Sequence, residues 1–238
     1  MSLDKELNDS SVSADYDLYV RDEWERFVKD PARAQALLDA VAGTTISRVL
    51  DVGCGAGQEL LPFVAARQAF GVGLDYSPHA GREGRRLYRA HQPSASVAFL
   101  RGAAEALPFK TGSFDVVICR LALPYTDNAR ALAEMARVLR AGGTLLLKFH
   151  HARYYVKKLS DGLFAGDVLS MVHSVRVLLA GAFYHVAGRQ SHSRLTAGGE
   201  TFQTEWLLKR ELSRQRLTIR CRLPDSNPLT PSLVITKD

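Results

Sequence analysis

Two features of the sequence have residue types and spacing suited to ligand binding. The segment Val49-Leu50-Asp51-Val52-Gly53-Cys54-Gly55-Ala56-Gly57 places three glycines directly after an apolar run. Glycines at such a point let the backbone turn sharply and approach a ligand with no Cβ in the way. Asp75 follows Gly57 by 18 residues and ends the next apolar run. A carboxylate in that place accepts hydrogen bonds from both hydroxyls of a ribose.

A dinucleotide site also uses glycines and a distal acid, so the two patterns must be compared. The dinucleotide pattern is G-x-G-x-x-G, with a pyrophosphate at the following helix N-terminus. Here the pattern is G-x-G-x-G, and Glu59 stands where the pyrophosphate would lie. A carboxylate there repels phosphate, so the sequence favours a phosphate-free cofactor that carries an ammonium, a carboxylate and a sulfonium.

The elements that must position these residues alternate between strands and helices. Continuous apolar runs, typical of parallel strands covered on both faces, occur at residues 48–52, 69–74, 97–100, 114–118 and 144–149. Ser77-Pro78 and Asp127 are suited to begin helices between them, and Gly142-Gly143 to end one. This alternation predicts a doubly wound sheet with right-handed crossovers.

The flanking segments complete the expected fold. The first 14 residues predict a loose arm, residues 15–42 two helices separated at Pro31, and residues 151–200 a helical insertion. A helix over 204–215 and antiparallel strands over 217–223 and 233–237 follow. The prediction is an α/β fold: a doubly wound, mostly parallel seven-stranded sheet with an antiparallel last strand, a helical N-terminal arm and a helical insertion after the fifth strand. It forms one domain, divided into 1–45 (arm), 46–150 (cofactor-binding core), 151–203 (helical lid) and 204–238 (closing helix and strands).

Composition narrows the class of protein. The net charge of +6 belongs to residues 151–220, because the rest of the chain is balanced. The three cysteines lack metal-type spacing, which predicts three reduced core thiols and no metal site. No apolar run approaches the roughly 18 residues of a spanning helix, and no signal segment begins the chain. We therefore expect a cytoplasmic protein with no transmembrane segment, monomeric or homodimeric.

The region from about residue 46 to 150 resembles the class I S-adenosylmethionine-dependent methyltransferases. Four motifs occur in the family's order: the glycine loop, Asp75, the segment Gly102-Ala103-Ala104-Glu105-Ala106-Leu107-Pro108-Phe109, and Ser113-Phe114-Asp115-Val116-Val117-Ile118 with Val138 to Gly143 after it. Ala103 and Pro124-Tyr125 depart from the family, where many relatives carry an acid and histidines. The resemblance implies a methyltransferase with a Rossmann-like fold and S-adenosyl-L-methionine as its cofactor.

The resemblance also implies roles for particular residues. Asp51, Gly53, Cys54 and Gly55 would hold the methionine end, Asp75 the ribose, and Tyr76 would pack beside the adenine. Ala104 and Glu105 would line the adenine edge, and Cys119 and Arg120 would pass near the sulfonium.

The sequence constrains the methyl acceptor less than it constrains the fold or the cofactor. A base is needed only if the acceptor must lose a proton, and the candidates are His150, His151 and Tyr125. The alternatives are pocket lining or strand-end capping for the two histidines and an ordinary loop aromatic for Tyr125. The apolar insertion favours a small, fairly apolar acceptor methylated on oxygen or nitrogen. An RNA or protein acceptor bound by the basic segment 151–220, a non-catalytic cofactor-binding protein, and contact of the insertion with a membrane surface remain alternatives. Nucleic acid is disfavoured, because the aromatic and basic residues of the segment are not interleaved.

Overall fold

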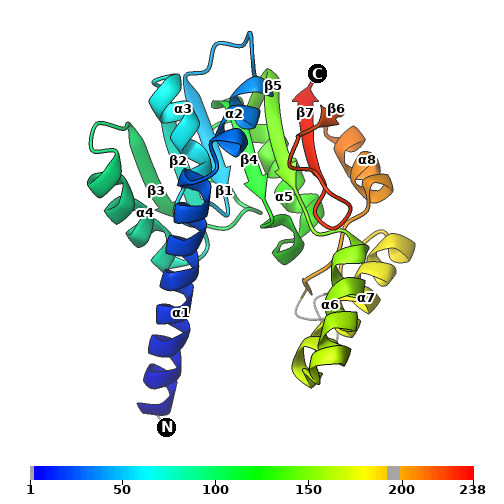
Figure 1. Ribbon diagram of the computed structural model, residues 1–238. Coiled ribbons are helices and arrows are strands. Elements are labelled where there is room, and N and C mark those ends of the chain that lie inside the picture. The colour runs from blue at the N-terminus through cyan, green and yellow to red at the C-terminus, as the bar shows by residue number, and fades with distance from the viewer. Residues whose placement is uncertain (1–2, 192–198) are drawn as a thin grey trace.

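The computed structural model describes residues 3–191 and 199–238, with side chains from residue 16 onward. One sheet has the strand order β3-β2-β1-β4-β5-β7-β6 (Figure 1). The strands are β1 (Arg48–Val52), β2 (Phe70–Asp75), β3 (Val97–Arg101), β4 (Phe114–Arg120), β5 (Leu139–Lys148), β6 (Leu217–Arg222) and β7 (Ser232–Lys237). Strands β1 to β5 are parallel to one another, whereas β7 runs antiparallel to both β5 and β6. The predicted fold class is confirmed.

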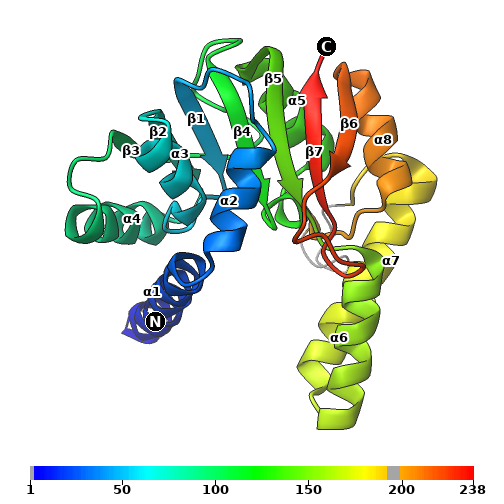
Figure 2. The same cartoon turned by 45° about the horizontal axis from the view of Figure 1, so that its top comes forward.

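Helices cover both faces of this sheet. Helices α1 (Leu3–Val28), α2 (Pro31–Asp39), α3 (Leu61–Ala66) and α4 (Pro78–His91) lie on one face, and α5 (Asn128–Val138) and α8 (Glu205–Arg214) on the other (Figure 2). Trp24, Phe27 and Phe63 are buried in the first layer, and Met135 and Leu208 in the second. The strands are therefore apolar on both sides, which is why they read as continuous apolar runs.

The N-terminal segment differs from its prediction. Residues predicted to be a loose arm are the first turns of α1, which begins at Leu3 and extends beyond the edge of the sheet (Figure 1). Val20, Trp24 and Phe27 fix the other end of this helix against the sheet. Extending an existing helix requires no new nucleus, so polar residues with adequate helix propensity continue it.

The glycine pair before the fifth strand also behaves differently from its prediction. Helix α5 ends at Val138, and β5 begins at Leu139, so Gly142 and Gly143 lie inside the strand. Gly142 has φ +69°, and the register of β4 with β5 shifts where these glycines stand. The glycines make an irregularity in the strand instead of ending the helix.

The insertion after β5 is a helical hairpin of α6 (Ala152–Ala165) and α7 (Val168–Ala187), and residues 192–198 of the predicted lid lie outside the described residues. Gly166, with φ +68°, ends α6, and the Asp167 side chain caps α7. The hairpin and α1 both project beyond the edge where β1 and β4 end (Figures 1 and 2). Among the described helices, α7 has the length and composition to cross a membrane, contrary to the expectation that no run approaches that length.

The cysteines correspond only partly to the expectation of three core thiols. All three are free, with Cys54 and Cys119 buried, but Cys221 is exposed on β6. Strand β6 is the edge of the sheet, so its outer side chains have no neighbouring strand to cover them.

Candidate functional site

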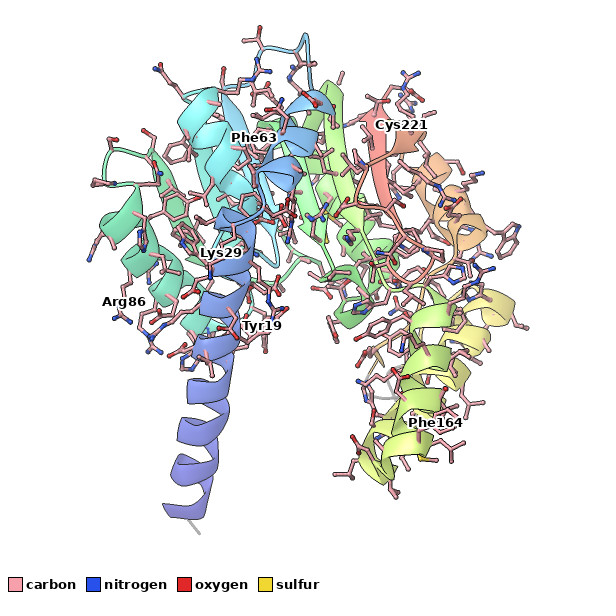
Figure 3. The ribbon with its side chains drawn as sticks, viewed as in Figure 1. Tyr19, Lys29, Phe63, Arg86, Phe164 and Cys221 are labelled. Carbon is pink, nitrogen blue, oxygen red and sulfur yellow. The ribbon has the colours of Figure 1, made fainter. Side chains whose placement is uncertain are left out.

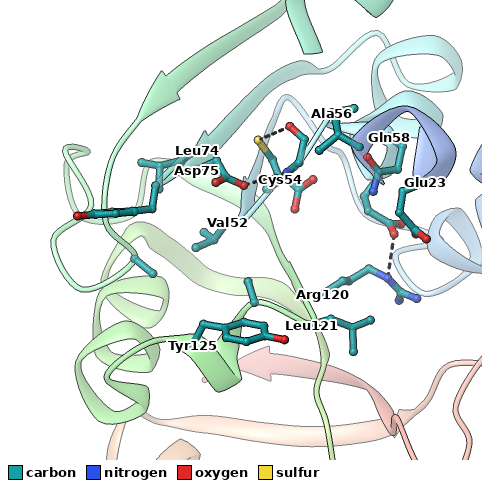
Figure 4. A pocket seen from close by; sticks show the side chains of 18 of the residues that line it. Glu23, Val52, Cys54, Ala56, Gln58, Leu74, Asp75, Arg120, Leu121 and Tyr125 are labelled. Carbon is teal, nitrogen blue, oxygen red and sulfur yellow. Dashed lines mark hydrogen bonds and ion pairs between the residues drawn. The ribbon is translucent and has the colours of Figure 1, made fainter. Parts of the chain in front are cut away.

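A cavity of about 720 Å³ opens at the carboxyl ends of β1, β2 and β4 (Figure 4). Its lining comes from the loop after β1, the ends of β2 and β4, the loop over residues 102–105, and α1. The carboxyl edge of an open α/β sheet is where ligands bind in such folds. The volume is within the range of small-molecule sites.

The glycine loop after β1 forms one wall of the cavity. Gly53 has φ +71°, and a Cβ added there would lie 2.2 Å from the Ala122 Cβ, so the loop packs directly on the segment after β4. Gly57 has φ +76°, and its carbonyl accepts a hydrogen bond from the Tyr88 hydroxyl at 2.8 Å. Both positions require glycine for conformation as well as space.

Two carboxylates stand at opposite ends of this wall. Asp51 is 1% exposed, lines the cavity, and its Oδ2 has no hydrogen-bond partner among the described residues. Burial, together with the nearby Glu59 and Asp75, raises the pKa of Asp51 well above its usual value. A buried unpartnered oxygen carries a cost that a ligand ammonium would remove. Asp51 therefore fits the amino group of a methionine moiety.

Asp75 is held by the backbone on both of its oxygens. The Gly55 N–H donates to Oδ2 at 3.0 Å and the Ser77 N–H to Oδ1 at 2.9 Å. Burial raises the pKa of Asp75, and these backbone donors oppose the rise. Each carboxylate oxygen has a second lone pair, so Asp75 keeps the capacity to accept from two ribose hydroxyls.

The predicted adenine side lines the same cavity. Tyr76 is largely exposed, and the Arg101 guanidinium lies 5.8 Å from its ring centroid. Ala104 is buried, and Glu105 accepts a hydrogen bond from the Asp127 N–H at 2.8 Å, where α5 begins. An exposed ring beside a small buried residue leaves room for a planar base to stack. Cys54 also lines the cavity, but its buried thiol is directed to β2. If Gly73 of β2 carried a Cβ, that atom would lie only 2.8 Å from the Cys54 Sγ.

A largely buried network of charged side chains borders the cavity at Arg120. Arg120 Nε lies 3.0 Å from Glu59 Oε1, and the Arg120 guanidinium also pairs with Asp225, which comes from the loop between β6 and β7. Arg33 pairs with the same Glu59, and Lys148 Nζ lies 2.7 Å from Asp225 Oδ2. Burial alone would raise the pKa of Asp225, but the opposite effect of Arg120 and Lys148 is larger, and the pKa falls to about 2.

This network bears on the choice between the two cofactor types. The three cationic side chains at the cavity are each paired with a carboxylate, whereas Asp51 and Asp75 form no ion pair with any described side chain. A pyrophosphate would find no unpaired cation among these lining residues. A cofactor with an ammonium and a sulfonium fits Asp51 and Asp75. Glu59 is itself paired with Arg33 and Arg120, so its charge is not the main reason why phosphate is disfavoured, contrary to the sequence-based interpretation.

Of the three predicted candidates for a base, one lines the cavity and two do not. Tyr125 lines the cavity, and its exposed ring lies 6.5 Å from that of His150 in an edge arrangement. His150 and His151 do not line the cavity. The His150 ring is buried and stacks on the Tyr154 ring, with 4.1 Å between their centroids, and burial lowers the pKa of His150 to about 4. The His151 Nδ1 accepts a hydrogen bond from the Arg153 N–H and so caps α6. The two histidines therefore support the start of α6 and are not among the residues that line the cavity.

Cys119 is also outside the cavity. It lies in the apolar layer beneath β4, and burial raises its pKa to about 12. Its neighbour Arg120 points to the opposite side of the strand and does line the cavity. The alternation of side chains along a strand explains why only one of the pair can face the ligand.

Among the described residues, helix α1 covers part of the cavity, whereas the predicted lid includes residues 192–198, which lie outside the described residues. Tyr16, Tyr19, Val20 and Glu23 line the cavity, and no residue of α6 or α7 does. Sequence reasoning missed these residues, although they continue the three-and-four spacing of Trp24 and Phe27 toward the N-terminus. It also missed Lys148 and Asp225, which meet across 77 positions of sequence. Across the part of the chain that the structure describes, no group of three or more candidate ligands could hold a metal ion.

Comparison with known proteins identifies the class of the core. Residues 49–143 match a family described as "Methyltransferase domain". The uncharacterized methyltransferase YcgJ of Bacillus subtilis is 38% identical over 106 residues, 44% of this chain and 41% of that protein. A demethylmenaquinone methyltransferase of Renibacterium salmoninarum is 36% identical over 120 residues, 50% of this chain and 48% of that protein. The chain spans about half the length of the curated relatives it matches.

A solved structure extends the likeness of fold to nearly the whole chain. The magnesium protoporphyrin IX methyltransferase of Synechocystis, with bound S-adenosylhomocysteine, superposes with a TM-score of 0.61 at 17% identity, covering 97% of this chain and 100% of that one. The core is thus a class I S-adenosylmethionine-dependent methyltransferase domain with a Rossmann-like fold, as the resemblance implied.

Proposed function

We propose that the whole chain transfers a methyl group from S-adenosylmethionine to the oxygen or nitrogen of a small, fairly apolar molecule. The observation that carries the proposal is the unpartnered Asp51 in the same cavity as Asp75 and a set of tyrosines. These are Tyr16, Tyr19, Tyr76 and Tyr125. Their rings suit planar or apolar groups, and the enclosed volume suits a small molecule. One relative is named as an O-methyltransferase and another as acting on demethylmenaquinone.

The chain's own residues mainly bind and orient in this mechanism. When bound, the cofactor supplies an electrophilic methyl group on a sulfonium. Asp51 would hold its ammonium, Asp75 its ribose and Tyr76 its adenine. Tyr125 and the α1 tyrosines would then place the acceptor and exclude water, which are the main requirements of an in-line displacement. Although part of the Tyr125 ring is exposed, desolvation of its hydroxyl and the nearby Glu200 raise the pKa of Tyr125, so the hydroxyl stays protonated and can donate a hydrogen bond at neutral pH.

A polymer acceptor has less support from the arrangement of charges. Several basic side chains after residue 150 are already paired within the chain: Lys157 with Asp161, and both Arg210 and Arg214 with Glu211. Electrostatic capture of a polymer relies on cations that can release counterions. We therefore place the small-molecule acceptor first.

The test is methyl transfer by the full chain. Incubation with methyl-labelled cofactor and a panel of phenols, quinols, amines and RNA, followed by mass spectrometry, should show label on an apolar small molecule. Titration calorimetry should show saturable binding of S-adenosylhomocysteine and none of NAD. Cofactor binding without transfer to any acceptor would favour a non-catalytic binding protein, and label on RNA would refute the small-molecule assignment.

A further inference from the structure

Helix α7 is apolar on two opposite sides, but the protein covers only one of them. Ser174, Val177, Gly181 and Tyr184, at three-and-four spacing, are buried against the rest of the chain. A stripe of exposed apolar side chains runs along the opposite side; its members are Val168, Val172, Val175, Leu179 and Phe183. A helix that is apolar all round is normally covered all round. Only 28% of the most apolar 18-residue window of α7 is buried.

The exposure is concentrated in the α6–α7 hairpin. Ten of the 18 exposed large apolar side chains of the described residues belong to α6 or α7. Phe164, at the end of the hairpin far from the sheet, is 88% exposed (Figure 3). Contiguous apolar surface of this kind marks an interaction site.

The covered side holds the hairpin to the protein. A Cβ on Gly181 would lie 2.3 Å from the Phe202 ring, and His185 Nε2 lies 2.8 Å from the Thr204 hydroxyl. These contacts would be lost if α7 turned to cross a bilayer. The helix is therefore arranged to lie along a surface, where the stripe from Val168 to Phe183 is about 23 Å long.

The charge of the hairpin selects between a bilayer and a second copy of the chain. Residues 152–189 contain five basic and two acidic side chains. In a twofold dimer through this face, the same excess positive charge would face itself. An anionic lipid surface would instead attract it while the apolar stripe enters the interface.

We propose that the exposed stripe of α7, together with the end of the α6–α7 hairpin, docks the protein on the surface of an anionic lipid bilayer. The hairpin projects beyond the same edge of the sheet at which the cavity opens (Figure 1). Docking would thus bring the mouth of the cavity toward the membrane. The proposal concerns the surface alone and holds whichever acceptor the cavity binds.

The test is co-sedimentation of the full chain with vesicles of phosphatidylcholine alone or mixed with phosphatidylglycerol. The variant V172Q/L179Q alters the stripe. V28Q/L18Q replaces the same two residue types on α1, away from the cavity lining, and all four side chains are between 51% and 62% exposed. We expect binding to the anionic vesicles, weakened about tenfold or more by V172Q/L179Q and within about twofold of wild type for V28Q/L18Q.

The outcomes are distinguishable from failures of folding and from dimerisation. Circular dichroism and the affinity for S-adenosylhomocysteine should be the same in both variants and the wild type. Equal weakening by both variants, equal binding to neutral and anionic vesicles, or absence of binding would overturn the proposal. So would a wild-type dimer that V172Q/L179Q converts to a monomer in analytical ultracentrifugation, since the occupant would then be a second copy.

Discussion

At the scale of single residues, two aspartates with different surroundings line the cavity. Asp51 has an unpartnered oxygen in a buried position, whereas Asp75 is oriented by two backbone donors. The first therefore suits a charged group that would bring its own hydrogen atoms, and the second suits neutral hydroxyls that must be met in a fixed geometry.

Replacing Asp75 tests the ribose contact. Asp75→Ala should weaken binding of S-adenosylhomocysteine by about 1.5–3 kcal/mol, because charge-assisted hydrogen bonds to the hydroxyls are lost. Titration calorimetry measures the change, with Asp22→Ala, an exposed acid on α1, as the control. An affinity equal to that of the control would remove Asp75 from the site.

Asp225 should make stability depend on pH. Because Arg120 and Lys148 hold its pKa near 2 against a usual 3.8, the native state favours the ionised form. Its contribution is present above about pH 4 and is lost as the pH falls from 4 toward 2. Asp225→Asn should lower the free energy of unfolding at pH 7 by about 1–2 kcal/mol, allowing for partial exposure of the side chain.

Urea unfolding of wild type and Asp225→Asn at several pH values measures this dependence. The difference between the two proteins should shrink below pH 4 and be constant between pH 5 and 8. A difference that does not change with pH would show that Asp225 contributes through packing or turn geometry instead of charge.

The sequence predicted the residues that lie within continuous motifs and missed those that arrive from elsewhere. The predicted residues at the cavity lie at or just beyond the carboxyl ends of strands whose positions the pattern fixed; they are Asp51, Gly53, Gly55, Asp75, Tyr76 and Arg120. Asp225 reaches Arg120 across 105 positions, a contact that no local spacing encodes. The histidines were chosen for their place after the fifth strand and for the ordinary pKa of histidine near neutral pH, and only the structure shows which way their rings face.

At the scale of elements, the packing of helices on the sheet is decided by small residues. Helix α4 carries Gly81 and Gly84 on the side that meets Phe99. A Cβ on Gly84 would lie 2.6 Å from the Phe99 ring and 3.0 Å from the Ala56 carbonyl oxygen in the glycine loop. At Gly81 the nearest atom would be 3.4 Å away, an ordinary contact.

The two glycines give a matched pair of substitutions. Gly81→Ala should raise the free energy of unfolding by about 0.5–1 kcal/mol, because alanine favours the helix and no neighbour must move. Gly84→Ala should lower it by about 1–3 kcal/mol, because overpacking against Phe99 exceeds the same helix preference. Chemical denaturation measures both; stabilisation by Gly84→Ala would mean that α4 can move away from the sheet without cost.

Strands were the most predictable elements, and the hairpin was the least. Apolar runs buried on both faces leave few alternatives to a parallel sheet. The apolar content of α6 and α7 predicted helices correctly, but it did not determine on which side of the cavity they lie. That orientation depends on contacts such as Gly181 with Phe202, which are tertiary.

At the scale of the whole molecule, neighbouring residues of the same strands belong to opposite layers. Val49 of β1 packs with α1 to α4, whereas Leu50 packs with α5 and α8. Leu145 and Leu146 of β5 alternate in the same way. Unfolding either layer would expose one face of the central strands, so neither is expected to be stable without the other. For this reason we expect residues 1–238 to unfold as a single domain.

That prediction can be tested with probes already present in the two layers. Trp24 lies in the first layer and Cys119 in the second, while the exposed Cys221 should react with an alkylating reagent throughout. Three probes are followed in urea: Trp24 fluorescence in a Trp206→Phe variant, far-UV circular dichroism, and pulse alkylation of Cys119 mapped by mass spectrometry. We expect the same midpoint from all three, because a single cooperative unit exposes both layers together. Alkylation of Cys119 at lower urea than the change at Trp24 would show that the layer beneath β4 opens first, and the chain would then consist of more than one cooperative unit.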